Sequence, residues 1–111
     1  MVGEHALKQG EVWTIGQRAD LRYRVVVLSS EAHNDRPSAA PFCAPVVRQR
    51  GSADDLPPFA IALAETDPIS GVVVLNRMRR LPASIGAERL GLLTGASMAK
   101  INASLRELFD L

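Results

Sequence analysis

The segment DLRYRVVVLSS, residues 20–30, carries the strongest structural signal in the chain. The valines at 25–27 are β-branched and follow one another without a polar residue, which predicts a strand buried on both faces. Arg22 and Arg24 stand directly before these valines. A strand anchored in the core would hold guanidinium groups rigidly at its end, and the segment therefore raises the question of what these two groups bind.

Other segments have the β-branched or alternating composition of strands. They are residues 10–16, 40–47, 59–64 and 72–81, with a last short strand expected within 82–93. The stretches between them are dense in turn-forming residues and predict loops or turns. These are residues 31–39, 48–58 and 65–71.

The hydrophobic period changes near the C-terminus. Apolar residues recur there at spacings of three, four, three and one, at Met98, Ile101, Leu105, Leu108 and Phe109. This spacing places them on one face of an α-helix, with Thr94 as the expected N-cap and Ser97 as the second candidate. The pattern predicts a mainly β domain of the α+β class, in which the helix packs against a small, mostly antiparallel barrel or strongly bent sheet.

The chain has 111 residues, of which 47% are hydrophobic and 23% charged. These values fit one globular domain that spans residues 1–111. No apolar run approaches the roughly 18 residues of a membrane span, and the opening MVGEH lacks the basic-then-apolar order of a signal peptide. We therefore expect a cytoplasmic protein without membrane contact.

Cys43 is the only cysteine. It cannot form an internal disulfide, and a zinc site would need three or four ligands. Because Cys43 lies in the apolar segment PFCAPVV, we expect a buried core thiol. The sequence predicts neither a metal site nor a cofactor.

Arginine dominates the positive charge. The net charge is only +1, yet eleven of the thirteen cations are arginines, whose planar guanidinium matches phosphate groups and base edges. A GC-rich genome would also favour arginine. Several arginines stand at the ends of strand-like runs, namely Arg22, Arg24, Arg48, Arg50, Arg77, Arg79 and Arg80. Such clustering can create a local anion site on a nearly neutral protein.

Three segments, taken in order, resemble the MazF/PemK toxins of type II toxin–antitoxin systems. LKQGEVWTI resembles their opening strand, RYRVVVLSSEAHND their second strand and following loop, and VVVLNRMRRLPASIGAERLGLLTGASMAKINASLREL their C-terminal half. The resemblance extends from about Leu7 to Leu108. It implies a small SH3-like barrel of the CcdB/PemK type, with five to seven mostly antiparallel strands and a C-terminal helix.

The resemblance also implies a function. MazF/PemK toxins are metal-independent endoribonucleases (mRNA interferases), so the expected substrate is single-stranded RNA, and the expected partners are a cognate antitoxin and a second copy of the chain. The same superfamily includes the CcdB gyrase poisons, which use a tryptophan near the C-terminus. Here the only tryptophan is Trp13. There are two alternatives. One is a gyrase poison without catalysis, and the other is an inactive relative that binds RNA or antitoxin.

The resemblance assigns candidate catalytic residues. The family places a catalytic arginine just before the second strand. Arg24 is the first candidate for that position here, and Arg22 is the second. Arg48, at the end of the third strand, is the third catalytic candidate. The family carries a threonine or serine shortly after that strand. This sequence reads Val-Val-Arg-Gln at 46–49 and has no hydroxyl there.

Candidate RNA contacts come from the same resemblance. The family's basic RNA-contacting strand matches NRMRR, which contains Asn76, Arg77 and Arg79. Gln49 and Tyr23 complete the set, with Tyr23 as an aromatic available for base stacking. Arg24, Arg48 and Arg77 are expected to surround a shared anion pocket. The simpler alternative is that these arginines are solvated strand-end charges.

Metal-free RNA cleavage makes three demands on such residues. The 2′-hydroxyl must lose a proton, the pentavalent phosphate needs positive charge, and the 5′-oxygen must be protonated as it leaves. Arginine meets the second demand through bidentate hydrogen bonds but is a poor base. His33 is a possible base, although a solvated loop histidine is the simpler interpretation, and Ser29 and Ser30 are hydroxyl candidates.

Overall fold

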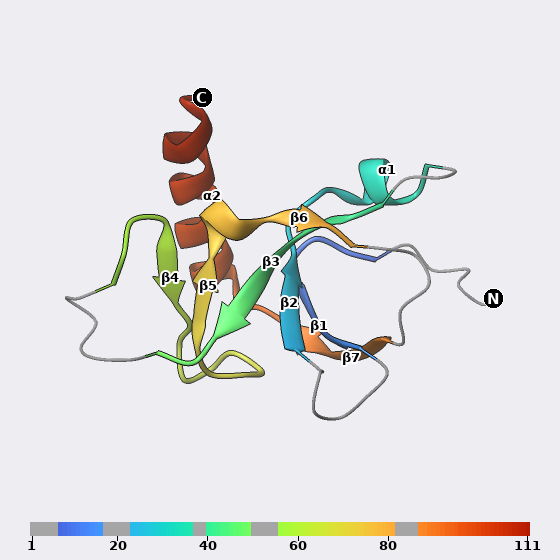
Figure 1. Cartoon of the computed structure of the whole chain (residues 1–111), viewed down its shortest axis with the longest axis horizontal. Coiled ribbons are helices and arrows are strands. Elements are labelled where there is room, and N and C mark those ends of the chain that lie inside the picture. The colour runs from blue at the N-terminus through green and yellow to red at the C-terminus, as the bar shows by residue number, and fades with distance from the viewer. Residues whose placement is uncertain (1–6, 17–22, 37–39, 50–55, 82–86) are drawn as a thin grey trace.

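The computed structural model describes residues 7–16, 23–36, 40–49, 56–81 and 87–111 (Figure 1). The strands are β1 (Glu11–Ile15), β2 (Tyr23–Val27), β3 (Phe42–Val47), β4 (Ala60–Ala62), β5 (Val72–Val74), β6 (Arg79–Arg80) and β7 (Ala87–Leu92). The helices are α1 (Glu31–Asn34), the 3-10 helix η4 (Leu75–Arg77) and α2 (Gly95–Phe109).

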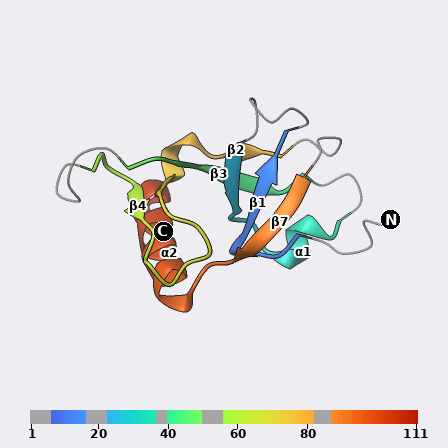
Figure 2. The same cartoon turned by 90° about the horizontal axis from the view of Figure 1, so that it is seen from below.

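The strands form one antiparallel sheet in the order β4-β5-β3-β2-β1-β7, and β6 pairs with β3 beside β5. The sheet twists strongly from β4 to β7, and α2 stands beside β4 and η4 (Figures 1 and 2). The predicted mainly β architecture with a C-terminal helix is confirmed. Of the two predicted forms, the described strands adopt the bent open sheet, with β4 and β7 at opposite ends, rather than a closed barrel.

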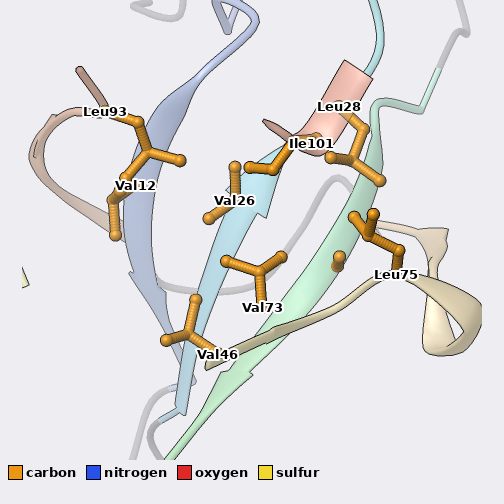
Figure 3. Packing of buried hydrophobic residues seen from close by; sticks show 9 residues of the cluster. Val12, Val26, Leu28, Val46, Val73, Leu75, Leu93 and Ile101 are labelled. Atoms are coloured by element: carbon orange, nitrogen blue, oxygen red, sulfur yellow. The ribbon is translucent and has the colours of Figure 1, made fainter. Parts of the chain in front are cut away.

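Burial of β2 explains its run of valines. Val26 is fully buried on the face that carries α2, where it packs with Val12, Val73 and Ile101 (Figure 3). Val25 and Val27 point to the opposite face, and each is at most 2% exposed. Both faces of β2 are therefore covered, as the continuous β-branched run predicts.

Helix α2 begins at the predicted cap. The Thr94 hydroxyl accepts a hydrogen bond from the Ser97 amide, so Ser97 lies in the first turn rather than at the cap. Ile101 is fully buried against the sheet, whereas Phe109, at the end of the predicted apolar face, is 56% exposed. Within the described residues, neither α-helix has the length and apolarity needed to cross a bilayer.

Two local predictions are wrong. The predicted loop 31–39 contains the one-turn helix α1, whose cap is the Ser30 hydroxyl. The predicted strand 72–81 breaks into β5, η4 and β6, because Leu75 turns inward and is completely buried. Next to this break, β3 pairs with neither β5 nor β6 at Pro45, which has no N–H to donate.

A buried carboxylate joins β7 to β1. Glu11 accepts hydrogen bonds from the amide of Lys8, the indole of Trp13 and the Nε of Arg89, the last at 2.7 Å. Burial alone would raise the pKa of Glu11, but these hydrogen bonds and the Arg89 charge outweigh it and leave the pKa below its usual value. The network lies where the pairing of β1 with β7 shifts register, between Val12 and Trp13, and it secures the edge strand there.

Candidate functional site

Antiparallel pairing brings Arg24 and Arg48 together. Arg24 lies at the start of β2 opposite Val46, near the end of β3. Arg48 and Gln49 follow β3 directly. Because β2 begins where β3 ends, side chains far apart in the sequence meet at one end of the sheet.

The connection between β4 and β5, residues 63–71, reaches the same end of the sheet, because Val72 at the start of β5 pairs with Val47. The result is a hollow of about 340 Å³, named here the arginine hollow. It is lined by Arg24, Arg48, Gln49, Leu63, Ser70 and Gly71. None of these described lining residues is acidic, so the hollow favours an anion.

Gly71 allows the connection to approach β3 closely. Its φ of +135° lies in a region that side chains rarely adopt, and a Cβ there would stand 2.7 Å from the carbonyl oxygen of Val47. Glycine is therefore required at this position. The close approach sets the neighbouring residue, Ser70, into the wall of the arginine hollow.

A second hollow of about 540 Å³ adjoins the first and shares Arg48 and Gln49 with it. Arg77 adds another guanidinium, and the remaining described lining residues are apolar, namely Val47, Leu56, Pro57, Ala60, Val72 and Val74. We name it the apolar hollow. An apolar floor with cationic groups at its rim suits a ligand that carries both a flat apolar ring and a phosphate.

Tyr23 and Arg79 form a pair on the sheet. The Arg79 guanidinium lies 5.1 Å from the centre of the Tyr23 ring and donates a hydrogen bond to its hydroxyl. Tyr23 is 38% exposed, so the ring still offers surface to a ligand. Side chains alternate along a strand, so Tyr23 points to the face opposite Arg24, and this is also the face to which Val47 of the apolar hollow points.

The other candidates are more scattered. Asn76 is exposed on η4 and lines neither hollow. Arg22 lies outside the described residues. His33 bonds the carbonyl of Ala40 and packs against Phe42, so it is held in α1 and does not line the hollows. Among the described residues, no group of three His, Cys, Asp or Glu gathers as a metal site would require.

Cys43 is a buried thiol, as predicted, with 2% of its surface exposed. Burial raises its pKa to about 12, and the charge of Arg79 lowers it only in part. The thiol is therefore protonated at neutral pH and is no nucleophile.

Sequence reasoning missed Ser70. Its segment, ETDPISG, predicts a turn and carries no signal of proximity to an arginine. Only the pairing of β5 with β3 places Ser70 beside Arg24 and Arg48. The sequence likewise did not predict the contact between Tyr23 and Arg79, because these residues lie 56 positions apart.

Known proteins share the sequence pattern and the fold of this chain. A family model of PemK-like, MazF-like toxins of type II toxin–antitoxin systems matches residues 8–109. An endoribonuclease from mycobacterial species is 28% identical, with a TM-score of 0.75 over 96% of this chain and 94% of its own. No curated protein sequence matches the chain significantly.

Two further structures share the fold. One is an endoribonuclease in complex with its cognate antitoxin from mycobacterial species, 24% identical with a TM-score of 0.77 over 96% of this chain and 97% of that one. The other is MazF from Deinococcus radiodurans, 23% identical with a TM-score of 0.77 over 97% of this chain and 100% of that one.

Proposed function

Because the chain belongs to the PemK-like, MazF-like family of toxins of type II toxin–antitoxin systems, we propose that it cleaves single-stranded RNA without a metal ion. The family resemblance expected from the sequence is confirmed, and its 28%-identical relative is described as an endoribonuclease. The observation that carries the proposal is the arginine hollow, where Arg24 and Arg48 converge without an acidic lining residue among those described.

In the proposed reaction, the RNA 2′-oxygen attacks the adjacent phosphorus and the bond from phosphorus to the 5′-oxygen breaks. The products are a 2′,3′-cyclic phosphate and a 5′-hydroxyl. Arg24 and Arg48 bind the non-bridging phosphoryl oxygens and stabilise the negative charge of the pentavalent transition state. Arginine is a poor general base, so we assign the 2′ proton to water, which also supplies the proton for the 5′-oxygen.

RNA extends from the arginine hollow into the apolar hollow. There a base would rest on Val47 and Val72 while Arg77 and Gln49 bind the backbone. The exposed ring of Tyr23 offers a stacking surface, and Arg79 holds that ring in place while it also contacts a phosphate of the RNA. Arg22 remains a catalytic candidate, and Asn76 a candidate RNA contact, predicted from the sequence resemblance alone.

One experiment separates the candidate functions. Purified protein is incubated with a long RNA in EDTA, beside a gyrase supercoiling assay. We expect RNA fragments with cyclic phosphate ends and unchanged supercoiling. Intact RNA with blocked supercoiling would instead support the gyrase poison. RNA that is bound but not cut, with normal supercoiling, would support the inactive relative.

Arg79 offers a quantitative test of RNA binding. Arg79→Ala should weaken binding of an uncleavable 2′-deoxy oligonucleotide and reduce the slope of log affinity against log salt by about 0.7, the value for one lost phosphate contact on a single strand. Fluorescence anisotropy across a salt series measures both. Arg106→Ala, in the last turn of α2 and outside both hollows, is the matched control. An unchanged slope in Arg79→Ala would remove Arg79 from the RNA path.

The proposed partners are a cognate antitoxin and a second copy of the chain, and the proposed location is the cytoplasm. One relative was solved with its cognate antitoxin, which supports the first. A largely apolar groove supports the second; it is lined by Leu28, Ser29, Phe42, Met78, Leu105, Phe109 and Leu111. Light scattering should give twice the 12.0 kDa of one chain. A mass of one chain at micromolar concentration would exclude a stable dimer.

A further inference from the structure

Among the described residues that line the arginine hollow, one carries a hydroxyl group. It is Ser70, and the other five described lining residues are Arg24, Arg48, Gln49, Leu63 and Gly71. The Ser70 side chain is exposed, and the described part of the chain provides it with no hydrogen-bond partner. Its hydroxyl is therefore available to a ligand in the hollow.

Such a hydroxyl complements the two arginines. A phosphate carries several acceptor lone pairs, and guanidinium groups approach it as planar forks from fixed directions. A serine hydroxyl is compact and rotates freely, so it can donate to an oxygen that the forks do not reach. Since β3 ends at Val47 and is followed by Arg48 and Gln49, the end of this strand offers no hydroxyl at this point.

A buried carboxylate holds the segment that carries Ser70. Asp67 is the one buried residue of the connection 63–71 and is 9% exposed. Its Oδ2 accepts from the Ala64 amide at 2.7 Å, and its Oδ1 accepts from the Thr94 amide at 2.8 Å. The Ser97 hydroxyl also donates to it. These bonds tie the connection to the first turn of α2.

The bonding of Asp67 also fixes its charge. Burial alone would raise its pKa, but the hydrogen bonds from Ser97, Thr94 and Ala64 outweigh burial, so the pKa lies below its usual value. The carboxylate therefore stays ionised, and keeps accepting these bonds, at neutral pH.

Two further contacts complete the attachment. The Leu63 amide donates to the Gly71 carbonyl at 2.9 Å and closes the base of the connection. Pro68 packs on β7 at Gly91, where a Cβ would stand only 2.6 Å from the proline ring. Ser70 is thus attached to a segment anchored on the sheet and on α2, although most of its neighbours are exposed.

We propose that Ser70 is a catalytic residue whose hydroxyl donates a hydrogen bond to a phosphoryl oxygen between Arg24 and Arg48, and that Asp67 is a positioning residue that holds it there. The proposal rests on the proposed endoribonuclease activity. It assigns the hydroxyl of the site to the β4–β5 connection rather than to the end of β3.

The test compares Ser70→Ala, Ser70→Thr and Thr66→Ala in single-turnover cleavage of RNA. Thr66 is exposed in the same connection and lies outside the hollow, so its variant controls for loss of a hydroxyl from this segment. A hydrogen bond to a charged group corresponds to about a tenfold to hundredfold change in rate, and we expect that loss in Ser70→Ala. Ser70→Thr should keep most of the activity and Thr66→Ala all of it.

A double-mutant cycle tests Asp67. Asp67→Asn should lower cleavage in the same direction, and adding Ser70→Ala to it should cost little more, because the hydroxyl is already misplaced. A purely structural effect would instead leave the two losses additive, and thermal melts establish that each variant is folded at the assay temperature. Wild-type cleavage by Ser70→Ala would overturn the assignment of Ser70 alone. Wild-type protein that leaves RNA intact would overturn the proposed function and this assignment together.

Discussion

Arg24→Ala should lower kcat/KM for RNA cleavage by about a hundredfold to a thousandfold, the effect of removing one group that stabilises developing charge. Arg24 projects from a strand whose next three residues are almost fully buried. Its guanidinium is therefore held in place and loses little conformational entropy when it binds the phosphate. Water cannot replace these preorganised hydrogen bonds well. The measurement is cleavage of an oligonucleotide with a single ribonucleotide, at enzyme in excess.

Two further variants serve as comparisons for Arg24→Ala. Arg24→Lys keeps the charge but loses the bidentate fork, so it should recover only part of the lost rate. Arg106→Ala, exposed on α2, removes the same charge from outside the hollows and should cleave as the wild type does. If Arg24→Ala cleaves normally while Arg48→Ala does not, Arg48 takes over the principal role. If neither matters, the arginine hollow is not the active site.

Ile101→Ala should reduce the free energy of unfolding by about 2–5 kcal/mol, the usual cost of a cavity left by a large aliphatic side chain. Ile101 is fully buried and is the residue of α2 that reaches the centre of the cluster with Val12, Val26 and Val73 (Figure 3). Urea unfolding followed by circular dichroism measures the change.

The next residue along α2 supplies the control. Asn102 is exposed, and Asn102→Ala should change the free energy of unfolding by no more than about 0.5 kcal/mol. Ile101→Val should cost about 0.5–1.5 kcal/mol because it removes only one methylene. Equal effects at positions 101 and 102 would mean that α2 does not depend on this face for its attachment to the sheet.

Much of the secondary structure could be predicted because its signals are local. Three consecutive valines predict a strand buried on both faces, and the valines of β2 are buried on both faces of the sheet. The spacing of Met98, Ile101 and Leu105, with Thr94 before them, marks α2 and its cap. The prediction of one strand over 72–81 was wrong for a physical reason, since inward rotation of Leu75 depends on a cluster built from distant residues.

The site could be predicted only in part. Strand ends and the family resemblance indicated Arg24, Arg48, Gln49 and Arg77, and the structure brings these residues to two adjoining hollows. Asn76 was indicated by the same basic segment, yet it lines neither hollow. The anchoring carboxylates, Glu11 in β1 and Asp67 between β4 and β5, were not indicated as buried, because their donors come from remote segments.

By itself, the sequence determined the class of fold, the family and the arginines available for an anion, since β-branched runs, helical spacing and side-chain chemistry are properties of neighbouring residues. The tertiary structure decided which of those arginines meet, and that Ser70 joins them. Those distances depend on the register of β2, β3 and β5, and on a turn that Gly71 alone permits beside Val47. Strand register is a property of the assembled sheet, and no short stretch of the chain contains it.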